Sequence, residues 1–132
     1  MSNQSTTSEI IGDIQSNASY AHKLRVVEEF LRSPAAKQLL EKCPKVREIV
    51  YEYYSILLEL EQKLEFLDEI HLRCNDPALS PKEKLQWKEL LDKTINYIEG
   101  PCGLKAKVQK LEAQILDAWN TKPECFIVKI KP

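Results

Sequence analysis

The feature that most constrains this chain is a long apolar run between Val46 and Cys74. Written as heptads, the run places large apolar side chains at three heptad positions over most of its length. A two-stranded coiled coil buries mainly two such positions, whereas a wider stripe is typical of a bundle helix with neighbours on two sides. We therefore predict one amphipathic helix at about residues 45–74. Its core stripe contains Val46, Ile49, Tyr53, Ile56, Leu60 and Leu67.

The apolar stripe of this helix has to be covered in the folded protein. Burying one large apolar side chain contributes about 1.5–3 kcal/mol, and a whole domain is stable by only about 5–15 kcal/mol. A stripe of about twelve apolar positions left in water would therefore cancel the stability of the chain. The cover comes either from shorter helices of the same chain or from another protein, and the sequence leaves both open.

Serine and proline mark the boundaries of the other helices. Apolar spacing predicts helices over 18–32, 34–43, 81–99 and 103–119. The clearest boundary is Ser80, which Pro81 and Glu83 follow in the pattern of a capping box. With only 3 Gly, the chain lacks the turns of a sheet-rich fold. We predict an all-α fold, an antiparallel helical bundle built on the long helix, with a short extended C-terminal tail.

The last residues of the chain change character. The segment CFIVKIK alternates like a β-strand, with Phe126, Val128 and Ile130 on one side. The sequence offers no second strand candidate, so this segment either packs on the helices or pairs with a strand of another chain. We predict three segments, a disordered tail over 1–9, a helical bundle domain over 10–120 and an extended tail over 121–132.

Charge and motifs argue against several classes of function. The net charge of −1 is not that of a nucleic-acid-binding domain, which usually carries a basic stripe. No run of 18 apolar residues is present, so we expect no membrane span. Because no phosphate loop, nucleophile elbow or metalloprotease motif is found, we predict no cofactor, no metal, no small-molecule substrate and no enzymatic activity.

His71 is the histidine whose neighbours could suggest catalysis. His71 falls on the apolar side of the long helix, with Asp68 and Cys74 three residues away. A catalytic base needs such neighbours, but a partly buried histidine bonded to a carboxylate is far more common. We therefore assign His71 no catalytic role.

The four cysteines predict neither a zinc site nor a secreted scaffold. They lie 31, 28 and 23 residues apart, at Cys43, Cys74, Cys102 and Cys125, whereas zinc ligands come in close pairs. The first nine residues, MSNQSTTSE, do not resemble a secretory signal. We expect reduced thiols and a cytoplasmic or nuclear location.

Candidate partner-binding residues are found in the long helix and in the tail. Tyr51 and Tyr54 point away from the core stripe, and exposed tyrosine is common at interfaces. The alternative is that both are rim tyrosines, half covered by the fold of the chain itself. Lys63 occupies a seam position, where it either extends to the rim or meets an acid of a neighbouring helix. The full set is Tyr51, Tyr54, Lys63, Phe126, Val128 and Ile130.

The segment KEKLQWKELLDK, residues 82–93, resembles a helix of the BAG co-chaperone domain. The final helices of that family contact the ATPase of a heat-shock chaperone through basic residues. Gln86 and Trp87 stand where the family needs basic residues, so the chain is not assigned to it.

Two hypotheses for function follow from the sequence. The first is a non-enzymatic protein–protein interaction module, a small subunit or adaptor of an intracellular assembly, with a protein partner or a second copy covering its apolar surface. The alternative is a monomeric helical-bundle regulator or co-chaperone that binds a folded enzyme through a charged helix face.

Overall fold

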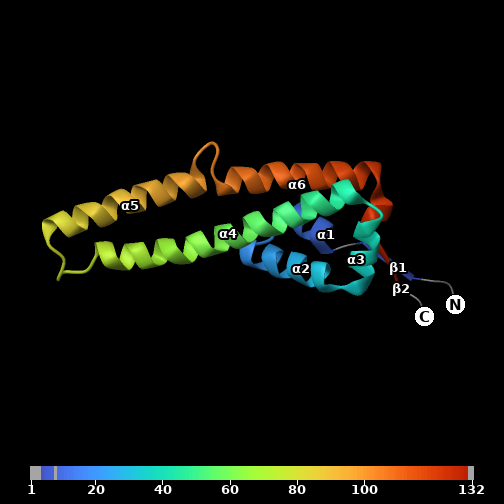
Figure 1. Cartoon of the computed structure of the whole chain (residues 1–132), viewed down its shortest axis with the longest axis horizontal. Coiled ribbons are helices and arrows are strands. Elements are labelled where there is room, and N and C mark those ends of the chain that lie inside the picture. Colours follow the sequence, from blue (N-terminus) through green and yellow to red (C-terminus); the bar gives the residue numbers. More distant parts are fainter. Residues whose placement is uncertain (1–3, 8, 131–132) are drawn as a thin grey trace.

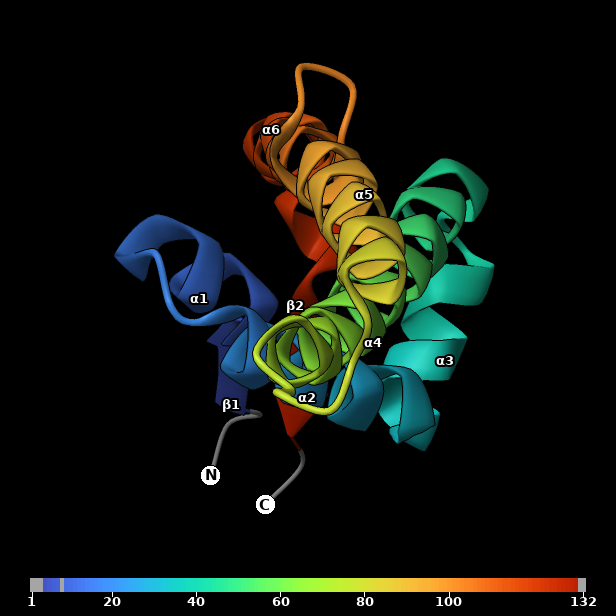
Figure 2. The same cartoon turned by 90° about the vertical axis from the view of Figure 1, so that its left-hand side faces the viewer.

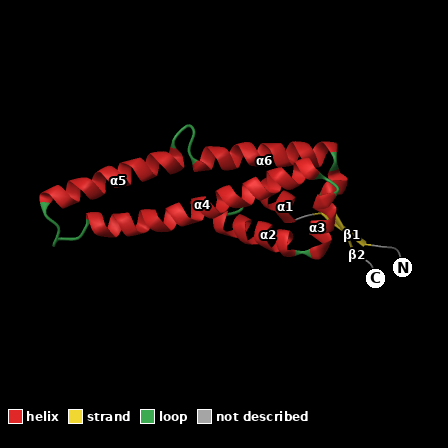
Figure 3. Ribbon diagram, in the orientation of Figure 1, coloured by secondary structure: helices red, strands yellow, loops and turns green. Residues whose placement is uncertain are grey.

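The computed structural model describes residues 4–7 and 9–130, and the side chains of residues 9–127. Helices dominate this part of the chain, and the predicted all-α bundle on one long helix is confirmed (Figure 3). The helices are α1 (Glu9–Ser16), α2 (Tyr20–Arg32), α3 (Pro34–Glu41), α4 (Pro44–Cys74), α5 (Pro81–Glu99), α6 (Leu104–Thr121) and the 3₁₀-helix η1 (Pro123–Cys125).

Helix α4 forms the long axis of the molecule. Helices α5 and α6 follow one another along it in the opposite direction, and α1 to α3 pack beside its first half (Figure 1). In the view along the axis, α1 and α3 lie on opposite sides of α4 (Figure 2). The first half of α4 is therefore surrounded, whereas its second half has α5 as its neighbour.

Serine side chains begin three of the helices, and the sequence predicts two of these caps, Ser33 and Ser80. The hydroxyl oxygens of Ser19, Ser33 and Ser80 accept hydrogen bonds from backbone amides in the first turns of α2, α3 and α5. At α5 the Ser80 hydroxyl also donates to the Glu83 carboxylate at 2.9 Å, where we expected that carboxylate to bond the Ser80 amide. The boundary is the predicted one, with a different reciprocal bond.

The joint between α5 and α6 depends on a glycine. Gly103 is buried as the N-cap residue of α6, and a Cβ atom there would lie 2.7 Å from the Ile98 carbonyl oxygen. Any larger residue would have to push the end of α5 away. The close approach keeps α5 and α6 nearly continuous along α4 (Figure 1).

One hydrophobic core contains buried residues from each of the helices α1 to α6. The six predicted stripe residues of α4 all contribute to it: Val46, Tyr53 and Leu60 are buried, and Ile49, Ile56 and Leu67 are partly buried and packed against it. The other buried members are Ile10, Ile11, Val26, Val27, Leu31, Leu40, Val50, Leu57, Ile98, Leu104, Val108, Leu111, Ile115, Cys125 and Phe126.

The two ends of the chain pair with each other, which the sequence analysis did not anticipate. Strand β1 (Gln4–Thr7) runs antiparallel to β2 (Ile127–Ile130). The expected disorder of residues 1–9 is wrong for β1, as is the expectation that the chain offers no second strand. A polar strand gives no apolar alternation to detect, yet its backbone groups bond a neighbour as well as those of an apolar strand.

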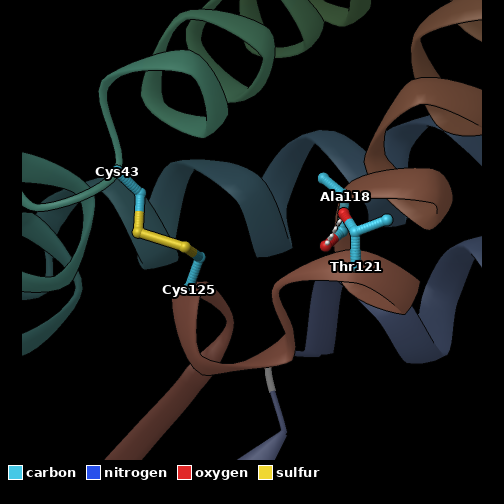
Figure 4. The surroundings of a disulfide bond; sticks show 4 residues. All are labelled: Cys43, Ala118, Thr121 and Cys125. Carbon is cyan, nitrogen blue, oxygen red and sulfur yellow. Dashed lines mark hydrogen bonds between the residues drawn. A yellow bond between two sulfur atoms is a disulfide. The ribbon is translucent and has the colours of Figure 1, made fainter.

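Cys43 and Cys125 form a disulfide, so the expectation of four reduced thiols is also wrong. Cys43 lies between α3 and α4, and Cys125 closes η1 beside the end of α6 (Figure 4). The bond spans 82 residues and ties the end of α6 to the start of α4. Cysteine spacing carried no signal for this contact, because it depends on how the helices pack. Cys74 and Cys102 are free thiols.

Candidate functional site

The second half of α4, the following loop and α5 form a hairpin that extends beyond the rest of the molecule (Figure 1). We call residues 61–99 the projecting hairpin, and residues 9–60 with 104–127 the packed end. Among the hairpin side chains only Ile70, Thr94 and Ile98 are buried. Two helices that share so few buried residues have a thin core.

A single face of α4 shows how the cover is lost along the helix. Leu57, Leu64 and His71 are seven residues apart and therefore share a face. Leu57 is fully buried, Leu64 is half-buried and His71 is exposed. The sequence continues its apolar pattern through Leu64, but the helices that bury this face end before the hairpin does.

Large apolar side chains are exposed mainly on the projecting hairpin. Leu72 is 75% exposed and Leu85 is 57% exposed. Single exposed apolar residues are ordinary on a protein surface, whereas several on one element indicate a contact region. Among the described side chains, the exposed large apolar residues are Tyr51 and Leu58 on the packed end and Phe66, Leu72, Leu85, Ile95 and Tyr97 on the hairpin.

Lys63, a predicted partner-binding residue, lies at one edge of this hairpin. Its ammonium group is 5.8 Å from the ring centroid of Phe66 and 5.6 Å from that of Tyr97. The negative faces of the two rings stabilise the charge where we expected either solvent or an acid. Two aromatic rings on adjacent helices thus hold a lysine at a seam position.

Tyr97 is fixed at the same edge by a second interaction. Its hydroxyl donates a 2.6 Å hydrogen bond to the Glu59 carboxylate. This bond, with a smaller effect of burial, raises the pKa of Tyr97. Glu59, Lys63, Phe66 and Tyr97 therefore form a connected polar and aromatic edge between α4 and α5.

The structure separates the other predicted partner-binding residues from this hairpin. Tyr51 is 48% exposed on the packed end, while Tyr54 is half-buried and packs on the core. Phe126 is fully buried, and its ring meets Trp119 edge-on with centroids 6.2 Å apart. The assignment of Phe126 to a partner surface is wrong, because the chain's own core binds the ring.

Two further residues of that set belong to strand β2. Val128 pairs with Thr6 and Ile130 pairs with Gln4 of the same chain. The backbone of this segment therefore finds a partner without a second protein, and the side chains of both residues lie outside the described part of the structure.

A buried polar network in the packed end was missed by the sequence analysis. Lys23 is 2% exposed, and its ammonium lies 2.7 Å from a Glu112 carboxylate oxygen. The Tyr53 hydroxyl donates to the same oxygen at 2.6 Å. Burial, reinforced by the bond to Glu112, raises the pKa of Tyr53 strongly. Helical periodicity could not reveal this polar network, because Lys23 and Glu112 lie 89 residues apart.

A second polar contact adjoins this network. The His22 imidazole lies 3.1 Å from one carboxylate oxygen of Asp13, and the other Asp13 oxygen is buried with no hydrogen-bond partner. Asp13 also contributes to the raised pKa of Tyr53. Lysine, glutamate, tyrosine and aspartate from α1, α2, α4 and α6 thus lie close together inside the packed end.

His71 does not gather groups that would support catalysis. Its side chain is exposed on the hairpin, and its backbone carbonyl accepts a bond from the Asn75 side-chain amide. In the described part of the chain, no cluster of three or more His, Cys, Asp or Glu residues is placed to hold a metal ion. None of the described helices is both long enough and apolar enough to cross a membrane.

Comparisons with protein-family models, curated proteins and solved structures gave no match for this chain. The fold and the exposed surface define the class: an all-α bundle with one projecting helical hairpin.

Proposed function

We propose that this chain is a non-enzymatic protein–protein interaction module, a small subunit or adaptor, and that the projecting hairpin is where its partner binds. The observation that carries the proposal is the change along α4. Five of its side chains are buried between Val46 and Leu60, and only Ile70 is buried after that. A helix that keeps its apolar pattern beyond its own bundle has surface to share.

The hairpin has a thin core, with only Ile70, Thr94 and Ile98 buried among its described side chains. Most helical stability in proteins comes from packing of an apolar face against neighbouring elements. Two helices that pack only against each other bury little apolar surface, so the hairpin gains little stability from burial. A third element placed on this face would cover Leu64 and neighbouring apolar residues, at about 25 cal/mol for each Å² removed from water. Binding would therefore stabilise the hairpin and the complex together.

The partner that suits this surface is an amphipathic helix with basic flanks. The α4 side of the hairpin exposes the acids Glu65, Asp68 and Glu69 beside its apolar residues. A helix lying along α4 would bury its apolar stripe and place lysine or arginine next to these acids. We propose no catalytic role for the chain.

Site-specific photocrosslinking in the native host cells tests this proposal. The photoreactive residue p-benzoylphenylalanine replaces Leu72 or Leu85 in the full chain, and as a matched control it replaces the exposed Gln109 of α6. We expect one defined crosslinked protein from the hairpin positions and none from Gln109. Equal crosslinking at all three positions, or none at the hairpin, would contradict the proposal.

The alternative function, a monomeric regulator or co-chaperone, would use charge more than apolar contact. Glu65 and Lys88 are exposed on the hairpin and offer a charged face. Under this alternative, reversing either charge abolishes the crosslink and Leu72→Ala leaves it unchanged. Under the proposal, with the probe at Leu85, Leu72→Ala weakens the crosslink more than either charge reversal does. A mass near 15.3 kDa for the purified chain in solution fits both functions. A mass that is a multiple of 15.3 kDa identifies the partner as a second copy of the chain.

A further inference from the structure

A cavity of about 650 Å³ opens between the start of α4 and the end of α6. It lies at the other end of α4 from the projecting hairpin, so it is independent of the surface proposed above. Its volume falls in the range of small-molecule sites, about 300–1,000 Å³. It is lined by Lys42, Cys43, Pro44, Lys45, Val46, Ile49, Gln114, Asp117, Ala118, Thr121 and Lys122.

The floor of this cavity is apolar and part of the hydrophobic core. Val46 is buried, and Ile49 and Ala118 are partly buried and packed against the core. One wall is fixed covalently, because Cys43 is bonded to Cys125 next to the end of α6 (Figure 4). A floor held by core packing and a disulfide keeps its shape without a ligand, which favours binding of a small apolar group.

The rim of the cavity carries mainly positive charge. Lys42, Lys45 and Lys122 line it, against the single acid Asp117. This excess is local, since the whole chain has a net charge of −1. The N-terminus of α4 also opens here. No side chain caps it, because its N-cap residue is the disulfide-bonded Cys43, and the helix dipole adds to the positive potential.

We propose that this cavity binds a hydrophobic carboxylate, a small amphiphile with an aliphatic chain and an anionic head. The chain lies on the floor formed by Val46, Ile49 and Ala118, and the carboxylate lies among the rim lysines at the start of α4. Apolar burial supplies affinity, and the lysines select an anion over a neutral or cationic analogue.

Titration of the full chain with decanoate tests the site, followed by calorimetry and by backbone amide spectra. Decanol and decyltrimethylammonium serve as neutral and cationic probes with the same chain. We expect decanoate to shift the amide signals of Val46, Ile49 and Ala118. Decanoate should also bind about tenfold more tightly than decanol, an affinity ratio that corresponds to the free energy of about two exposed ion pairs. Equal binding of all three probes, or shifts confined to the hairpin, would overturn the proposal.

Charge reversal distinguishes binding by the rim lysines from a general attraction of anions by the net charge of the chain. The double variant Lys45→Glu with Lys122→Glu should weaken decanoate binding about tenfold. The control Lys107→Glu with Lys110→Glu changes the net charge equally on exposed positions of α6 outside the cavity, and it should leave binding within twofold. All four lysines are at least partly exposed, so the fold should tolerate the changes. Equal losses in the two double variants would contradict a specific site.

Discussion

The two halves of helix α4 share one sequence pattern and have different surroundings. Between Val46 and Leu60 five side chains are buried, in the part of α4 that packs against α2, α3 and α6. Beyond Leu60 the apolar residues continue, but only Ile70 is buried and Leu72 is 75% exposed. Burial along this helix therefore follows the number of neighbouring helices, while the amphipathic pattern predicts only that a neighbour is needed.

The difference also separates two kinds of stabilisation. The packed end contains a disulfide, a buried ion pair and a continuous core. The projecting hairpin is held by a helix cap, by the aromatic edge around Lys63 and by a few buried side chains. Substitutions in the first region should lower global stability, and substitutions in the second should act locally.

The largest expected effect comes from breaking the buried ion pair. Glu112→Ala leaves the Lys23 charge and the Tyr53 hydroxyl buried without their acceptor, and should lower the free energy of unfolding by about 3–5 kcal/mol. Glu99→Ala removes the exposed partner of Lys105 and should cost less than about 1 kcal/mol. Urea denaturation measures both. Similar losses would show that the Lys23 pair is not shielded from water.

Removing the disulfide should have the next largest effect. The double variant Cys43→Ser with Cys125→Ser opens the covalent loop between two residues that are 82 positions apart. It should lower the free energy of unfolding by about 2–4 kcal/mol. Cys74→Ser with Cys102→Ser changes two free thiols and serves as the control. If the control pair loses as much stability, the covalent link does not stabilise the packed end.

The Tyr53 hydroxyl should couple stability to alkaline pH. Because the pKa of Tyr53 is raised above its ordinary value of 10.0 in the folded chain, the unfolded chain releases this proton first. Stability should therefore be complete below about pH 10 and fall as the pH rises above that value. Tyr53→Phe should lose about 1.5–3 kcal/mol at pH 8 and show a shallower decline above pH 10.

The control for this experiment is Tyr51→Phe, since Tyr51 is 48% exposed on the same helix. It should keep both the stability at pH 8 and the alkaline slope of the wild-type chain. An unchanged slope in Tyr53→Phe would mean that other groups cause the alkaline loss.

The smallest effect is expected on the hairpin itself. Ser80→Ala removes the hydroxyl that accepts a hydrogen bond from the Glu83 amide at the start of α5. The free energy of unfolding should fall by about 1 kcal/mol. Ser55→Ala, at an exposed position of α4, should leave stability unchanged or raise it slightly, because alanine has the higher helix propensity. Circular dichroism melts measure both variants. A loss from Ser55→Ala equal to that from Ser80→Ala would contradict the role of the cap.

The helices were predictable because their signals are local. The capping box at Ser80 and the heptads of α4 each act within a few residues. Contacts across the chain left no such signal. Phe126 looked like one face of a strand and is instead a core residue beside Trp119, and no sequence pattern linked Lys23 to Glu112. The sequence predicted that the stripe of α4 needs cover, but where that cover ends depends on the lengths and packing of the other helices.

Residue-resolved hydrogen exchange along α4, measured at two protein concentrations, tests whether the hairpin is an open binding surface. We predict that amides between Val50 and Leu60 exchange only by global unfolding, while those between Leu64 and Cys74 exchange through a partial opening of lower free energy. If a second copy covers the hairpin, the protection of its amides should rise with concentration. Equal protection of both halves at both concentrations would show that the hairpin is already covered, and would contradict an open binding surface there.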